Sequence, residues 1–118
     1  MPQKTEKNEI TRENVYRRLQ TVMDPELDID IVSLGLIYEV SVSLVQTQQG
    51  ERKFIHILMT LTTPGCPLAG MFDKLLKDSL LDLDGIDVHK DVDIELTFDP
   101  PWIPDMMSEE ARAELDLF

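Results

Sequence analysis

The sequence predicts an α+β fold, a two-layer sandwich in which two main helices cover one face of a small mixed sheet of three to four strands. A short C-terminal helix follows. Apolar residues recur at helical spacing in two segments and alternate with polar residues in others. The 118 residues and the 42% hydrophobic content suit one core, against which helices and sheet bury their apolar sides.

The chain is expected to consist of a polar N-terminal tail, residues 1–10, and a single domain, residues 11–118. Met1–Asn8 is polar, and no apolar segment with the length of a signal peptide or a membrane-spanning helix follows it. We therefore expect a cytoplasmic protein.

The first helix is expected to begin at Thr11, whose hydroxyl can cap it, and to continue through Met23. Asp24–Pro25 then opposes continuation. Residues 36–45 alternate between apolar and polar and predict a half-buried strand. Residues 54–61 are partly apolar on both faces, which predicts a central strand. It is expected to pair as a hairpin across a long polar loop, residues 46–53.

The second helix is expected from about Pro67 to Leu83, because proline suits a first helical position and apolar residues then recur at helical spacing. Gly85 is a plausible stop after it. Alternation over residues 88–98 predicts another strand, which Asp99–Pro100 ends. Ser108 can cap a last short helix that ends near Leu117.

The charge of the chain disfavours some classes of partner. Its formal net charge is −12, from 23 acidic and 11 basic residues, and no segment gathers Lys or Arg. Such a chain repels phosphate groups. We therefore expect no binding to nucleic acid or to anionic membranes.

The sharpest local feature is the segment Thr62–Pro67, in which Thr62, Thr63, Pro64 and Gly65 precede the only cysteine of the chain, Cys66. Here a strand ends and a helix begins, so Cys66 is expected at the helix N-cap. The positive end of the helix dipole favours a thiolate there, which is both a nucleophile and a ligand for soft metals. Alternatively, Cys66 is a buried, inert residue.

Three other features are candidates. Asp24–Pro25–Glu26 places two carboxylates on a stiff turn, which suggests a metal or an acid–base role, although such a tripeptide more often ends a helix with solvated charges. Gly35 is expected to have a structural role before the first strand. Trp102 either covers the edge of the core or contacts a partner.

Other polar residues are weaker candidates. His56 and His89 have no second ligand at metal-binding spacing, so each is interpreted as structural. Asp91, Asp93 and Glu95 alternate with apolar residues, as on a solvated face of a sheet, and are not expected to bind metal.

Four segments together resemble the SufT- and PaaD-like family, whose members are associated with iron–sulfur protein maturation: Asp24–Glu26, Val32–Leu36, Leu61–Pro67 and Pro101–Ser108. The resemblance covers about residues 11–115. It implies a two-layer α+β fold with Asp24 close to Cys66, and Cys66 as the functional cysteine. Ser33 departs from the pattern, since many relatives carry Asp there, and this puts any role for a carboxylate at that position in doubt.

The resemblance also implies transient binding of iron or an iron–sulfur cluster. A cluster generally takes roughly four protein ligands, mostly thiolates, and this chain offers one thiol. Nothing is therefore expected to bind tightly. Two chains could share a labile cluster through two copies of Cys66 in a homodimer, with Asp24 or an external thiol completing the coordination.

Three functions remain open. The first is a maturation factor that carries iron or a cluster through Cys66 to apo-proteins. The second is an adaptor that holds no metal and recruits client proteins to the assembly machinery; a PaaD-like role in oxygenase maturation is a narrower form of either. The third is a thiol enzyme with Asp24 or His56 as base, which is the weakest, so the chain is not expected to be an enzyme.

Overall fold

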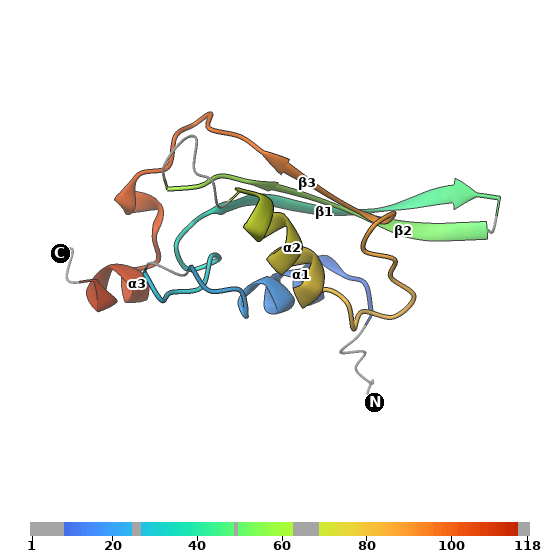
Figure 1. Ribbon diagram of the computed structural model, residues 1–118, viewed down its shortest axis with the longest axis horizontal. Coiled ribbons are helices and arrows are strands. Elements are labelled where there is room, and N and C mark those ends of the chain that lie inside the picture. The colour runs from blue at the N-terminus through green and yellow to red at the C-terminus, as the bar shows by residue number, and fades with distance from the viewer. Residues whose placement is uncertain (1–8, 25–26, 49, 63–68, 116–118) are drawn as a thin grey trace.

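The computed structural model describes residues 9–24, 27–48, 50–62 and 69–115. A three-stranded mixed sheet has the order β1-β2-β3, and α1 and α2 lie on one face of it (Figure 1). The elements are α1 (Arg12–Leu19), β1 (Ile37–Thr47), β2 (Gly50–Met59), α2 (Ala69–Ser79), β3 (Val92–Leu96), the 3-10 helix η1 (Pro104–Met106) and α3 (Glu109–Glu114). This confirms the predicted α+β, two-layer architecture.

Helix α1 begins as predicted and ends early. The Thr11 hydroxyl accepts a hydrogen bond from the backbone N–H of Asn14 at 3.1 Å, as an N-cap does. The helix ends at Leu19, before the predicted Met23. Val22 is nevertheless buried, because its carbonyl accepts from the N–H of Ile31 at 3.0 Å in an irregular turn that packs on the core. Helical spacing beyond Leu19 therefore reflected burial rather than a helix.

Strands β1 and β2 form the predicted hairpin, with a much shorter loop. They pair antiparallel from Ile37↔Met59 to Thr47↔Gly50, with an irregularity between Ile37 and Glu39. Both strands therefore continue through most of the expected loop, and the hairpin projects beyond the two helices on the right of Figure 1. Pairing to a partner strand outweighs the low apolar content of this segment.

Strand β2 is central, as predicted, and pairs in parallel with β3. Ile55, Ile57 and Met59 are at most 1% exposed and face the helices. Strand β3 is shorter than the predicted residues 88–98, because the chain before Val92 forms a turn in which the N–H of Asp91 donates to the carbonyl of Asp87 at 2.7 Å.

Helix α2 ends at Ser79, not at the predicted Leu83. The N–H of Leu80 donates to the carbonyl of Lys77 at 3.1 Å, and that of Leu83 to the carbonyl of Leu80 at 3.1 Å, so single turns carry both leucines into the core. Gly85, with φ +73°, therefore lies in the loop after these turns and does not stop the helix.

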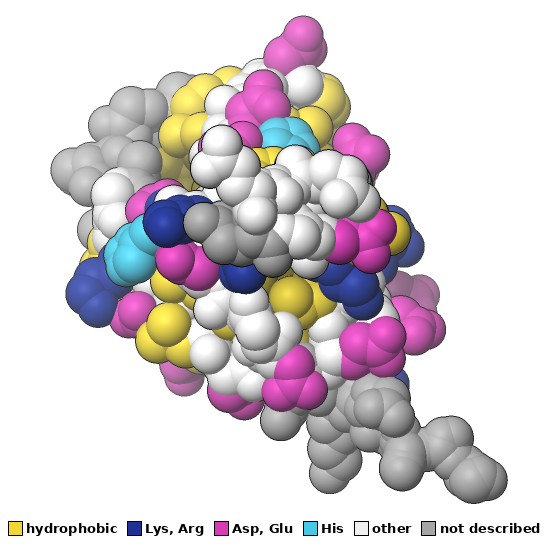
Figure 2. All heavy atoms as spheres, turned by 90° about the vertical axis from the view of Figure 1, so that its right-hand side faces the viewer, with side chains coloured by type: hydrophobic (Ala, Val, Ile, Leu, Met, Phe, Trp, Pro, Cys, Tyr) yellow, Lys and Arg dark blue, Asp and Glu magenta, His cyan; other side chains and the backbone are white. Residues whose placement is uncertain are grey.

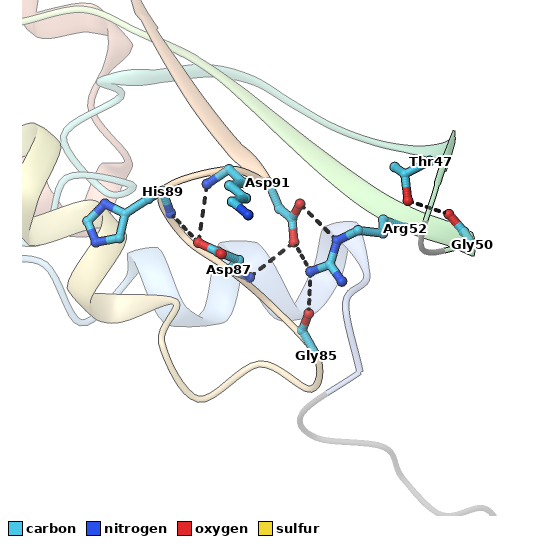
Figure 3. A network of polar contacts seen from close by, with 8 residues as sticks. Thr47, Gly50, Arg52, Gly85, Asp87, His89 and Asp91 are labelled. Atoms are coloured by element: carbon cyan, nitrogen blue, oxygen red, sulfur yellow. Dashed lines mark hydrogen bonds and ion pairs between the residues drawn. The ribbon is translucent and has the colours of Figure 1, made fainter.

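Asp91 corrects a further expectation, because its side chain is only 9% exposed instead of solvated. Its carboxylate is paired with the guanidinium of Arg52, and Oδ2 accepts from the backbone N–H of Asp87 at 3.0 Å (Figure 3). Arg52 also donates to the carbonyl of Gly85 at 2.8 Å. The turn end of the hairpin is thereby tied to the loop before β3.

This ion pair makes stability depend on pH. The hydrogen bond from Arg52 lowers the pKa of the Asp91 carboxyl, against the opposing effect of burial. Because the pKa is lower in the folded than in the unfolded chain, the stabilisation is complete above the unfolded value, near 4, and is lost as the pH falls through the folded value.

We expect Asp91→Asn to lower the free energy of unfolding at pH 7 by about 1–2 kcal/mol, since the pair is buried only on the Asp91 side. The variant should also lose less stability than the wild type between pH 4 and acid. Urea unfolding across this range measures both effects, with the exposed Asp84→Asn as control. Parallel pH curves for the wild type and Asp91→Asn would contradict the assignment.

Candidate functional site

Asp24, one of the predicted site residues, lies in the turn that follows α1. Its side chain is buried, at 5% exposure, and Oδ1 accepts from the backbone N–H of Leu27 at 3.0 Å. Its own N–H donates to the carbonyl of Ile29 at 2.9 Å, and its carbonyl accepts from the N–H of Asp28, which has φ +58°. The carboxylate therefore organises this turn and is not solvated.

Cys66, Thr63 and Pro67 lie outside the described residues, and so does Glu26. Thr62, half-buried, is the last described residue after β2, and α2 begins at Ala69. The segment 63–68 thus connects the end of the central strand to the second helix, as the sequence indicated. Among the described residues, no group of three or more His, Cys, Asp or Glu side chains is arranged to hold a metal.

Gly35 stands where the chain enters β1, and its conformation explains the residue. Its φ is +80°, and a Cβ there would lie 2.3 Å from the carbonyl oxygen of Met106. Only glycine meets both conditions without strain. Next to it, the carbonyl of Leu36 accepts from the N–H of Thr60 at 2.8 Å, so this corner touches the end of β2 as well as the C-terminal segment.

Trp102 belongs to the same corner. The indole Nε1–H donates to the carbonyl of Leu34 at 2.7 Å, and the half-buried ring packs against the core. The N–H of Ser108 also donates to the carbonyl of Ser33 at 2.8 Å. The segment Ser33–Leu36 is therefore fixed by Trp102, Ser108 and Thr60, three residues that are far away in the sequence.

His56 and Asp24 contact different residues. Its Nε2 is 3.0 Å from Oε1 of Glu95 and 3.5 Å from Oδ2 of Asp93, both exposed residues of β3. It is thus the partnered histidine that the sequence suggested. The two candidate bases of a thiol enzyme, Asp24 and His56, are engaged in different local networks.

Sequence reasoning missed a hollow beside Gly35. It has a volume of about 570 Å³ and is lined by Gly35, Ile37, Tyr38, Leu58, Asp99, Pro100 and Met106. The hydroxyl of Tyr38 donates to the carbonyl of Pro100 at 2.7 Å. No sequence signal links these two residues, because the irregularity after Ile37 takes Tyr38 out of the alternation that predicted its face.

No helix in residues 9–24, 27–48, 50–62 or 69–115 is long and apolar enough to cross a membrane. Figure 2 faces the projecting end of the hairpin and shows acidic side chains scattered over this side of the molecule with Lys and Arg between them. This face therefore offers no continuous basic patch for a phosphate backbone.

The chain is similar to proteins of iron–sulfur metabolism. It is 43% identical, over 89% of its length and 90% of the relative, to a protein of Porphyromonas gingivalis named Fe-S protein maturation auxiliary factor. It is 37% identical, over 80% of its length and 96% of the relative, to the Fe-S protein maturation auxiliary factor SufT of Staphylococcus aureus. These names describe maturation factors and not enzymes, in agreement with the expectation for this chain.

The fold has a solved counterpart as well. The crystal structure of a domain of unknown function from Bacillus anthracis superposes with a TM-score of 0.75 at 31% identity, covering 90% of this chain and 92% of that one. Residues 12–94 match the family described as Iron-sulfur cluster assembly protein. The resemblance to SufT-like proteins is thereby confirmed, and the chain belongs to the family of iron–sulfur cluster assembly proteins.

Proposed function

We propose that this protein is a cytoplasmic maturation factor that binds iron or an iron–sulfur cluster transiently through Cys66 and delivers it to apo-proteins. Membership of the family supports the general role. The composition supports the residue, because Cys66 is the only thiol of the chain and thiolate is the preferred protein ligand of such clusters.

A single thiolate makes the bound species labile. With roughly four ligands needed and one thiol available, the remaining positions are filled by Cys66 of a second copy, by an external thiol or by a carboxylate. Asp24 is the proposed acidic neighbour, since its turn holds a carboxylate in a fixed place. Incomplete ligation by one chain favours transfer to a client that offers more thiolates.

An adaptor that never holds metal is the second candidate. The hollow lined by Tyr38, Leu58 and Met106 favours it, because an apolar concavity of this size can receive side chains of a client protein. A role in maturing an oxygenase complex, as in PaaD-like proteins, would be a special case of either function. In an adaptor, Cys66 is structural, and client binding survives its replacement.

The two functions are separated by anaerobic reconstitution with iron and sulfide. We compare the wild type with Cys66→Ala and with Cys66→Ser, which keeps the size of the side chain and replaces the soft ligand. Bound iron and visible charge-transfer absorption should be present in the wild type and absent from both variants. Incubation with an apo-ferredoxin should then move the iron to the client.

Two results of this experiment would contradict the carrier function. If neither the wild type nor the variants bind iron, while all three bind the same client, the carrier function is wrong. If Cys66→Ser and Cys66→Ala bind as much iron as the wild type, iron is held elsewhere and Cys66 is not its ligand.

A further inference from the structure

The two edges of the sheet differ in how they are protected. Strand β3 is an edge of five residues, Val92–Leu96, with exposed acids at Asp93 and Glu95. Strand β1 is an edge of 11 residues, Ile37–Thr47. Short length and charge are common means of blunting an edge, and β1 lacks both along most of its length.

Two contacts show which backbone groups of β1 point away from β2. The N–H of Ile55 donates to the carbonyl of Asp91 at 2.7 Å, so Ile55 directs its backbone toward β3. Val42 and Ile55 are therefore a non-hydrogen-bonded pair, so the N–H and C=O of Val42 point away from β2. The same holds for Val40 and Leu44, which lie two residues away on either side. In agreement, the carbonyl of Val40 accepts from Nε of Arg12 in α1 at 3.0 Å.

The outward edge is also uncharged and partly apolar. Residues 40–47 contain no Asp, Glu, Lys, Arg, Pro or Gly. Leu44 is 61% exposed and Val45 42% exposed, since the hairpin extends beyond the helices that would cover Leu44. The hairpin end is tied by the Thr47 hydroxyl, which donates to the carbonyl of Gly50 at 2.7 Å (Figure 3).

We propose that β1 pairs with β1 of a second copy of this chain, antiparallel about a two-fold axis at Leu44. Val42 then faces Gln46, Leu44 faces its own copy, and about six backbone hydrogen bonds form from N–H and C=O groups that point outward. The register leaves the contact between Arg12 and Val40 in place.

A second copy suits this edge better than the rest of the surface. With a net charge of −12, two copies repel each other, and residues 40–47 let them meet without opposing any carboxylate along the paired segment. The antiparallel edge is its own complement under two-fold symmetry. Because β3 is short and acidic, the assembly closes at two copies and does not continue as a fibre.

The experiment measures the association of metal-free Cys66→Ala protein by sedimentation velocity, so that no thiol or cluster can link the chains. Leu44→Pro removes an outward N–H and leaves the bonds to β2 intact, and Leu44→Lys places two cations at the axis. Each should weaken dimerisation at least about tenfold. Leu81→Lys is the matched control, since Leu81 is 59% exposed and lies outside the sheet.

Hydrogen exchange identifies the interface directly. The amides of Val42, Leu44 and Gln46 should become protected as the protein concentration rises, while those of Ser43 and Val45, already bonded to β2, should not change. A protein that stays monomeric at about 0.5 mM, or a dimer that Leu44→Pro and Leu81→Lys weaken equally, overturns the proposal. Neither result bears on iron binding, which the reconstitution tests separately.

Discussion

Replacing Gly35 with Ala should lower the free energy of unfolding by about 3 kcal/mol or more. Two costs add. A residue with a side chain is strained at φ +80°, and the new methyl group would overlap the carbonyl oxygen of Met106 at 2.3 Å. Backbone cannot move aside as a side-chain end can, so η1 must shift as well. Urea unfolding followed by circular dichroism measures the loss.

Gly85→Ala separates the two costs. Gly85 has φ +73°, and a Cβ there would meet nothing within 4 Å. This variant should therefore lose only the conformational part, about 1 kcal/mol. Equal losses for Gly35→Ala and Gly85→Ala would show that the contact with Met106 contributes nothing.

Two substitutions of Asp24 should separate its role in the turn from its proposed role in iron loading. Asp24→Ala removes the buried carboxylate that accepts from the half-buried N–H of Leu27 and should cost about 1–3 kcal/mol of unfolding free energy. Asp24→Asn keeps an oxygen acceptor and should retain most of the stability. If the carboxylate assists Cys66, Asp24→Asn should nevertheless reduce iron loading several-fold in the reconstitution.

Asp30→Asn is the control for this experiment. Asp30 also accepts a backbone hydrogen bond in a turn, from the N–H of Ser33 at 3.0 Å, and is half-buried. It should change stability as little as Asp24→Asn does and leave iron loading unchanged. Equal loading by the wild type, Asp24→Asn and Asp30→Asn would restrict Asp24 to a structural role.

Apolar spacing predicted the type and order of the elements because burial imposes it directly. It misplaced their ends for the same reason. Val22 and Leu83 are buried at helical spacing beyond the last helical residue, in turns that the spacing cannot distinguish from helix. The cap residues Thr11 and Ser108 were correct, since each acts within its own turn, where Ser108 Oγ accepts from the N–H of Ala111 at 3.1 Å.

Contacts between distant segments could not be predicted in the same way. The pairing of Arg52 with Asp91 requires the parallel register of β2 with β3, and the hydrogen bond from Trp102 to Leu34 requires the path of the C-terminal segment. Gly35 was expected to be structural, but its neighbour Met106 lies far along the chain. The role of Cys66 stays a prediction from the sequence and the family.

The parallel pairing of β2 with β3 has an evolutionary consequence. Parallel strands require a crossover, here through α2, so residues 63–68 leave the carboxyl end of a central strand that is hydrogen-bonded on both sides. A connection anchored in this way can change its residues at little cost to the sheet, as the loops of α/β enzymes do. Selection could therefore adjust what residues 63–68, which include Cys66, bind while the scaffold stayed the same.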